Sequence, residues 1–232
     1  MNTVLITGSN KGIGLEMVKI YLDQGRSVIA CCRNPAGAEA LQALAAANDK
    51  LRVEAVEVGD PSSVVALKER LGDTPIDILL NNAGTAGPAP EKQSTQDIDF
   101  DGYLDTFKVN TLAPLHILQQ FRTNLAAGTD PKAVTITSQM GAISFEFINM
   151  MYAYCASKAA VNKIMRMIGD DMKQDGIAVQ LIHPGWVKTD MGGPGADLEP
   201  IESAQGIVDT ISKITLDDST AFHKWNGEVH GW

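Results

Sequence analysis

Residues 3–14 read TVLITGSNKGIG and contain the transition that decides the fold. A short Val-, Leu- and Ile-rich run, typical of a buried strand, passes through glycines into a stripe of apolar residues with helical spacing. Similar apolar runs of four to seven residues recur along the chain, with helical patterns between them. They are TVLIT, SVIACC, RVEAVEV, IDILLNN, AVTITS and IAVQLIHP. This alternation predicts an α/β protein, a doubly wound parallel sheet between two layers of helices.

Three glycines connect the first predicted strand to its helix. Gly8 permits a tight turn, Gly12 lets the backbone approach a phosphate, and Gly14 lets the helix pack close to the strand. The amide groups and dipole at a helix N-terminus favour an anion. We therefore predict a nucleotide site here. A glycine-rich turn without a ligand is the alternative.

The end of the second predicted strand indicates which nucleotide. Many sites for the non-phosphorylated dinucleotide place an acidic residue there to hold the ribose hydroxyls. This chain has Arg33 instead, and Lys11 lies inside the glycine loop. Two cations suit a ribose 2′-phosphate, so the sequence favours NADP(H). The alternative is that both are solvated surface charges.

Composition excludes several classes of protein. The 232 residues include 19 Lys and Arg against 28 Asp and Glu, and the resulting net charge of −9 argues against a nucleic-acid surface. Three cysteines, two of them adjacent, suggest reduced thiols in a cytoplasmic protein. The four histidines lack metal-ligand spacing, so no metal site is expected. No apolar run reaches membrane-spanning length, and the first residues do not form a secretion signal.

Motifs in the second half of the chain point to chemistry. Tyr154 is followed four residues later by Lys158, and residues four apart share a helix face, whereas Tyr152 is followed by Ala156. A nearby cation favours a phenolate and lowers the pKa of a tyrosine toward the range useful for proton transfer. Ser138 closes a predicted strand, and ligands of such sheets bind beyond the strands' carboxyl ends.

Taken together, these motifs resemble the classical short-chain dehydrogenase/reductase family in kind and order. They are TGSNKGIG at 7–14, NNAG at 81–84, Asn110 in KVNTLAP, Ser138 in TITSQ, YCASK at 154–158 and HPGWVKTD at 183–190. Within that family the chain is most similar to the sniffer-type and C-factor-like carbonyl reductases, on the basis of NKGIG, CRNP, HPGWVKTDMGG and WNGEVHGW. The resemblance implies one Rossmann-type domain over 1–232, with a seven-stranded parallel sheet whose last strand lies near AFHKWNG.

The resemblance also implies a set of site residues. Those expected to contact the cofactor are Gly8, Asn10, Lys11, Gly12, Ile13, Gly14, Arg33, Val58, Asn82, Ala83, Gly84, Tyr154, Lys158, Pro184, Gly185, Val187 and Thr189. One position departs from the family pattern, because the third strand ends with Glu57 before Val58 where an aspartate usually contacts adenine. Asp60 follows further on.

Four residues are expected to perform the reaction. We predict that Tyr154 supplies a proton, that Ser138 orients and polarises a carbonyl, and that Lys158 lowers the pKa of Tyr154 and holds the ribose. By resemblance, Asn110 positions a water that links Lys158 to solvent; without the family, hydrogen bonding inside a helix is the favoured reading. Tyr152 is expected to be a packing or pocket-wall residue.

The expected activity is NADPH-dependent reduction of an uncharged aldehyde or ketone. Stretches 139–152 and 186–200 are expected to form an apolar substrate wall, with core packing as the alternative for several members, above all Phe145 and Ile143. The wall residues are Met140, Ile143, Phe145, Phe147, Met150, Met151, Tyr152, Trp186 and Met191. Residues 192–200 are expected to be a mobile loop beside the site, or a plain surface loop. An NADP(H)-binding sensor with little turnover is the rival function. By resemblance, a homodimer or homotetramer is expected.

Overall fold

The computed structural model describes residues 3–145 and 151–232. Within them seven strands form one sheet in the order β3-β2-β1-β4-β5-β6-β7, and each neighbouring pair is parallel. The strands are β1 Thr3–Thr7, β2 Ser27–Cys32, β3 Leu51–Ala55, β4 Ile78–Asn81, β5 Lys132–Ile136, β6 Ala178–His183 and β7 Phe222–Lys224. The predicted α/β fold, including its seventh strand, is confirmed.

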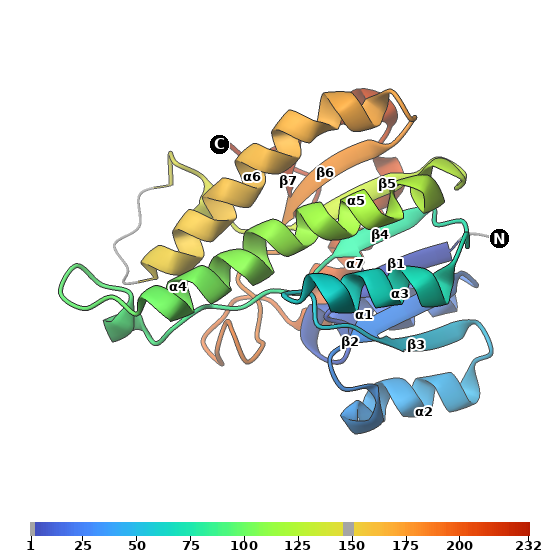
Figure 1. The fold of residues 1–232 in the computed structure, drawn as a ribbon, viewed down its shortest axis with the longest axis horizontal. Coiled ribbons are helices and arrows are strands. Elements are labelled where there is room, and N and C mark those ends of the chain that lie inside the picture. The colour runs from blue at the N-terminus through green and yellow to red at the C-terminus, as the bar shows by residue number, and fades with distance from the viewer. Residues whose placement is uncertain (1–2, 146–150) are drawn as a thin grey trace.

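The described residues form seven α-helices, six of which pack on the two faces of this sheet. They are α1 Gly12–Asp23, α2 Glu39–Ala47, α3 Pro61–Leu71, α4 Phe100–Phe107, α5 Ala113–Ala126, α6 Tyr152–Lys173 and α7 Pro200–Lys213. Helices α3, α5 and α6 lie across one face, where they share a buried core with Leu5 (Figure 1). Helices α1, α2 and α7 share the opposite core with Val4 and Ile6. Successive side chains of β1 therefore point into opposite layers, as strand geometry requires.

Both faces of the sheet are covered, which explains why the strands could be recognised as apolar runs. All five residues of β1 are buried. The strand order reverses at β1, which pairs with β2 on one side and with β4 on the other. In open α/β sheets such a reversal leaves a crevice at the carboxyl ends of the strands.

One long helix is interrupted at the point where it passes this crevice. Helices α4 and α5 are joined without a break by a π-helical turn, Lys108–Leu112, in which the Ala113 amide donates to the Lys108 carbonyl. Pro114 follows directly, and its ring removes the backbone donor that would otherwise bond to Asn110 four residues earlier. The proline thus accounts for the wide turn, which turns Asn110 inward, 1% exposed.

Candidate active site

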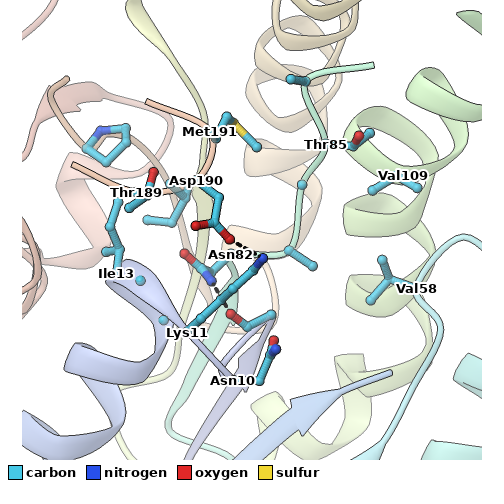
Figure 2. Close-up of a pocket in the computed structure, with 18 of the residues that line it drawn as sticks. Asn10, Lys11, Ile13, Val58, Asn82, Thr85, Val109, Thr189, Asp190 and Met191 are labelled. Carbon is cyan, nitrogen blue, oxygen red and sulfur yellow. Dashed lines mark hydrogen bonds and ion pairs between the residues drawn. The ribbon is translucent and has the colours of Figure 1, made fainter. Parts of the chain in front are cut away.

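A cleft of about 820 Å³ opens at the carboxyl ends of β1, β2 and β4. Most of the predicted cofactor residues line it. They are Gly8, Asn10, Lys11, Gly12, Ile13, Gly14, Arg33, Val58, Asn82, Ala83, Gly84, Tyr154, Lys158, Pro184 and Thr189. Figure 2 shows Lys11, Ile13 and Thr189 on one wall of this cleft, and Val58, Thr85 and Val109 on the opposite wall (Figure 2).

The remaining predicted contacts, Gly185 and Val187, do not line the cleft. A Cβ on Gly185, whose φ is +85°, would lie 2.3 Å from Leu198. Val187 is buried and forms a β-bridge with the same Leu198. Both therefore pack against the segment that leads into α7, and their contact with a cofactor stays a prediction.

The glycine loop has the close approaches that its sequence predicts. Gly8 has φ +65°, and a Cβ there would meet the Ala83 backbone at 2.8 Å. A Cβ on Gly14 would lie 2.3 Å from the Gly8 carbonyl oxygen. Asn82 fixes the loop from the neighbouring strand, because its Nδ2 donates to the carbonyls of Thr7 and Gly8, both at 3.0 Å. Only glycine fits at positions 8 and 14.

The start of α1 is suited to a phosphate group. The residue before the helix, Lys11, provides no side-chain cap for the first-turn amides, whereas Asp60 caps α3 and Asp99 caps α4. Gly12 has φ +55° and leaves room in front of Thr189. Uncapped amide groups and the helix dipole together attract an anion, so these residues fit the pyrophosphate of a dinucleotide.

The two cations expected at the ribose phosphate each face a carboxylate. Lys11 Nζ lies 2.5 Å from Asp190 Oδ2, the dashed contact between these residues in Figure 2. Arg33 Nε lies 3.9 Å from Glu57 Oε2. All four side chains are 46% or more exposed, and exposed pairs of this kind are weak. A phosphate can therefore compete for both cations.

Tyr154 lines the cleft, and Ser138, which does not line it, is the neighbour of its hydroxyl. The two hydroxyls share a hydrogen bond, and Ser138 Oγ also accepts from the Met140 amide at 3.1 Å. Asn162 on α6 holds this arrangement, since its Oδ1 accepts from Thr137 Oγ1 at 2.6 Å and its Nδ2 donates to the Gly141 carbonyl at 3.2 Å. Both segments flanking Ser138 are thus attached to the helix that carries Tyr154.

The structure separates the two tyrosines as predicted. Tyr154 is 8% exposed and lines the large cleft, while Tyr152 is 39% exposed and lines a separate cavity of about 290 Å³. Tyr154 therefore has Ser138 and Lys158 as neighbours. Tyr152 is a wall residue of the smaller cavity.

The expected acidification of Tyr154 by Lys158 does not appear. Burial raises the pKa of Tyr154, the hydrogen bond to Ser138 lowers it by less, and Cys155 raises it further. Lys158 Nζ donates to the Ile136 carbonyl at 3.0 Å and lies 5.8 Å from the centroid of the Tyr154 ring. Burial also lowers the pKa of Lys158 to about 8. Burial dominates the pKa of both groups, and the phenol keeps its proton at neutral pH.

Asn110 is held by three hydrogen bonds to protein groups. Its Oδ1 accepts from the Thr85 amide at 2.9 Å, and its Nδ2 donates to the Thr85 carbonyl at 2.8 Å and to Ser157 Oγ at 3.0 Å. A Cβ on Gly84 would lie 3.3 Å from Asn110 Oδ1 and 3.7 Å from Lys158 Nζ, so both side chains lie behind that glycine. The structure thus gives Asn110 a role in fixing the segment after β4. Its predicted water stays a prediction.

The predicted substrate wall is divided. Met191 lines the large cleft, whereas Met140, Ile143, Phe145 and Tyr152 line the smaller cavity. Ile143 is 85% exposed, so core packing is wrong for it, and Phe145 is also exposed. Trp186 is half exposed and donates from Nε1 to the Gly192 carbonyl. Of the other wall residues, Met151 is partly buried, and Phe147 and Met150 lie outside the described residues.

Several residues of the site were missed from the sequence. Thr85, Asp105, Thr106 and Asp190 line the large cleft. Gln93, which is fully buried, bonds to the first turn of α6. Asp190 directly follows the recognised Thr189 and could have been found from that position. The others lie in or against the segment after β4, which carries no motif.

In residues 3–145 and 151–232, no group of three or more His, Cys, Asp or Glu side chains is placed to hold a metal ion. None of the helices in these ranges has the length and apolar character needed to cross a membrane.

Comparison with known proteins places this site in a family. The pattern described as short chain dehydrogenase matches residues 2–197. The C-signal protein of Myxococcus xanthus is 34% identical over 158 residues, which cover 68% of this chain and 93% of that protein.

Two solved structures resemble the whole chain. The NADPH-bound carbonyl reductase from chicken fatty liver is 33% identical, with a TM-score of 0.93 and coverage of 100% of this chain and 99% of that one. Carbonyl reductase Sniffer of D. melanogaster is 28% identical, with a TM-score of 0.93 and full coverage of both chains. The family match and the site described above establish that this chain belongs to the short-chain dehydrogenase family of oxidoreductases.

Proposed function

We propose that the protein is an NADPH-dependent reductase of uncharged aldehydes or ketones. The observation that carries this proposal is the hydrogen bond between Ser138 and Tyr154, the latter in a cleft that also contains the uncapped start of α1. Similarity to an NADPH-bound carbonyl reductase supports the cofactor and the reaction class. NADPH, when bound, supplies the hydride.

The side chains would divide the remaining work. Ser138 donates a hydrogen bond to the carbonyl oxygen and orients it, and Tyr154 then transfers its proton to the alkoxide that forms. Tyr154 is protonated at neutral pH, so it holds the proton that the developing alkoxide will accept. The charged Lys158 stabilises the phenolate that is left behind, since the ammonium lies beside the ring in a low-dielectric pocket.

The cofactor end of the cleft would recognise NADP(H) by charge. Lys11 and Arg33 are the cations proposed for the 2′-phosphate, and the uncapped start of α1 is proposed for the pyrophosphate. Met191 is the apolar residue proposed to face an uncharged substrate. A homodimer or homotetramer stays part of the proposal.

A sensor of NADP(H) is the second candidate, and similarity to the C-signal protein favours it. One assay separates the two functions: NADPH oxidation followed with a panel of aldehydes and diketones. Turnover with any of them supports the reductase. Tight NADPH binding without turnover on the whole panel would leave the sensor.

A further inference from the structure

The helix that carries Tyr154 begins without a cap of its own. Met151 precedes the first residue of α6 and makes no side-chain bond to the first-turn amides. Such amides have no partner inside the helix and need one from elsewhere when they are buried. The Ala153 amide donates to Gln93 Oε1 at 2.9 Å, and the Tyr154 amide donates to the same oxygen at 3.4 Å. Gln93, 60 residues earlier in the chain, is therefore the cap of α6.

The NH₂ group of the Gln93 side chain also has hydrogen-bond partners. Nε2 donates to the carbonyl of Pro88 at 2.6 Å and to that of Ala86 at 3.3 Å. The side chain is 0% exposed. A buried amide with all of these bonds has one orientation, because turning it would place its NH₂ group against the α6 amides. It joins segment 85–93, which follows β4, to the backbone of the catalytic helix.

The Tyr154 backbone is attached to this segment by a second route. Ser157 Oγ donates to the Tyr154 carbonyl at 2.7 Å and accepts from Asn110, whose amide also bonds to Thr85. Tyr154 is thus held at its amide through Gln93 and at its carbonyl through Ser157 and Asn110. Both routes begin in segment 85–93, whose residues 85–87 line the cofactor cleft.

We propose that Gln93 is a positioning residue for Tyr154, which fixes the phenol relative to the cleft by capping α6. This inference rests on the proposed reductase function. It assigns Gln93 no contact with substrate or cofactor, and Gln93 does not line the cleft. Without the cap, the first turn of α6 would fray and displace the proton donor, and misplacement of a reacting group by about 1 Å can cost ~100-fold in rate.

The test replaces Gln93 by Leu, which keeps the volume and removes both hydrogen-bonding ends. We expect kcat for benzaldehyde reduction to fall about 10- to 100-fold while the Kd for NADPH changes less than about threefold. The matched control is Gln180→Leu in β6. Gln180 is also 0% exposed, and its amide bonds to Asp218 and His223, away from α6's first turn. That control should retain its kcat per folded molecule.

A second readout does not depend on turnover. Amide hydrogen exchange at residues 153 and 154 should speed up in Gln93→Leu, while exchange at Val161 and Met165 in the middle of α6 should be unchanged. In the Tyr154→Phe background, Gln93→Leu should cost no further activity, because both changes act through the same hydroxyl.

A further variant covers the case in which Gln93→Leu does not fold. In Gln93→Glu the ionised carboxylate accepts hydrogen bonds but cannot donate one, whereas the protonated carboxyl does both. The kcat of this variant relative to the unsubstituted protein should therefore rise as the pH falls. Unchanged exchange at 153 and 154, or parallel loss of kcat and NADPH affinity as in a general loss of fold, would overturn the positioning role. If the unsubstituted protein reduces nothing, the proposed function fails, and the exchange data still decide whether Gln93 caps α6.

Discussion

The Lys158 ammonium lies 5.8 Å from the centroid of the Tyr154 ring and donates its hydrogen bond to the Ile136 carbonyl. The lysine is therefore placed by the end of β5 as well as by its own helix. Its charge lies close to the phenol, yet the pKa of Tyr154 stays above the ordinary value. This geometry separates the cost of burying the lysine from the contribution that it makes to catalysis, and each can be measured.

Removing the buried charge should stabilise the protein. At neutral pH the free energy of unfolding of Lys158→Met should exceed that of the unsubstituted chain by about 2 kcal/mol. A pKa lowered from 10.5 to about 8 corresponds to a desolvation penalty of about 3 kcal/mol, from which the lost hydrogen bond to Ile136 takes about 1 kcal/mol.

The stability gained by Lys158→Met should depend on pH. A lysine whose pKa is lower in the folded state penalises folding fully below pH 8, and the penalty disappears as the pH rises toward 10.5. The stability difference between the two proteins should therefore shrink over that interval, as measured by urea unfolding at a series of pH values. A variant that is less stable at neutral pH would contradict the assignment. Turnover should be lost in either case.

Tyr154 and Tyr152 provide a matched pair of substitutions. Tyr154→Phe should lower kcat by about 10²- to 10⁴-fold, because only the proton donor is lost, and NADPH binding should stay close to normal. Tyr152→Phe should have a mild effect, since that side chain is exposed and lines the smaller cavity. Steady-state kinetics and NADPH fluorescence titration measure both. Equal losses of activity would show that the wrong tyrosine has been assigned.

Asp190 should weaken the binding of NADPH. Asp190→Asn releases Lys11 from its ion pair, so the affinity for NADPH should rise by up to about fivefold, the range expected of an exposed pair. NADH, which lacks the 2′-phosphate, should respond less. Asp197→Asn is the control, because Asp197 lies exposed on the same loop and forms no ion pair among the described residues. Tighter binding of NADH than of NADPH by the unsubstituted protein would reject the cofactor assignment.

The glycine loop should not accept even one methyl group at position 14. Gly14→Ala would force a Cβ to within 2.3 Å of the Gly8 carbonyl oxygen and 2.6 Å of Asn82 Nδ2. We expect a loss of stability of about 1–3 kcal/mol and a loss of NADPH binding. Gly195→Ala, whose Cβ would meet its nearest neighbour at 3.9 Å, should have wild-type stability in a thermal unfolding scan. An unchanged Gly14→Ala variant would show that the loop relaxes.

The sheet was predictable because parallel strands covered on both faces are continuous apolar runs. TVLIT and SVIACC coincide with β1 and β2. The run RVEAVEV was too long, since β3 ends at Ala55 and Glu57 instead donates its amide to Ser63 Oγ. The pairing of Tyr154 with Lys158 was equally visible, because it depends on helical spacing alone.

Contacts between distant segments could not be predicted in this way. Nothing near Gln93 indicates that its amide reaches α6, and the partner of Asn110 depends on how the segment after β4 returns. The pKa of Tyr154 depends on burial, which only the packed structure shows. Apolar loop residues such as Ile143 do not reveal which of two cavities they face.

The π turn between α4 and α5 requires a fixed number of residues, because that number sets how the two helices are rotated relative to each other. A regular α-helix advances about 100° per residue, so deleting one residue from Lys108–Leu112 would rotate α4 by that angle relative to α5. Asn110 would then swing away from Thr85. Related chains that keep this amide-to-backbone contact should therefore conserve the residue count between it and Pro114, even where the residue types drift.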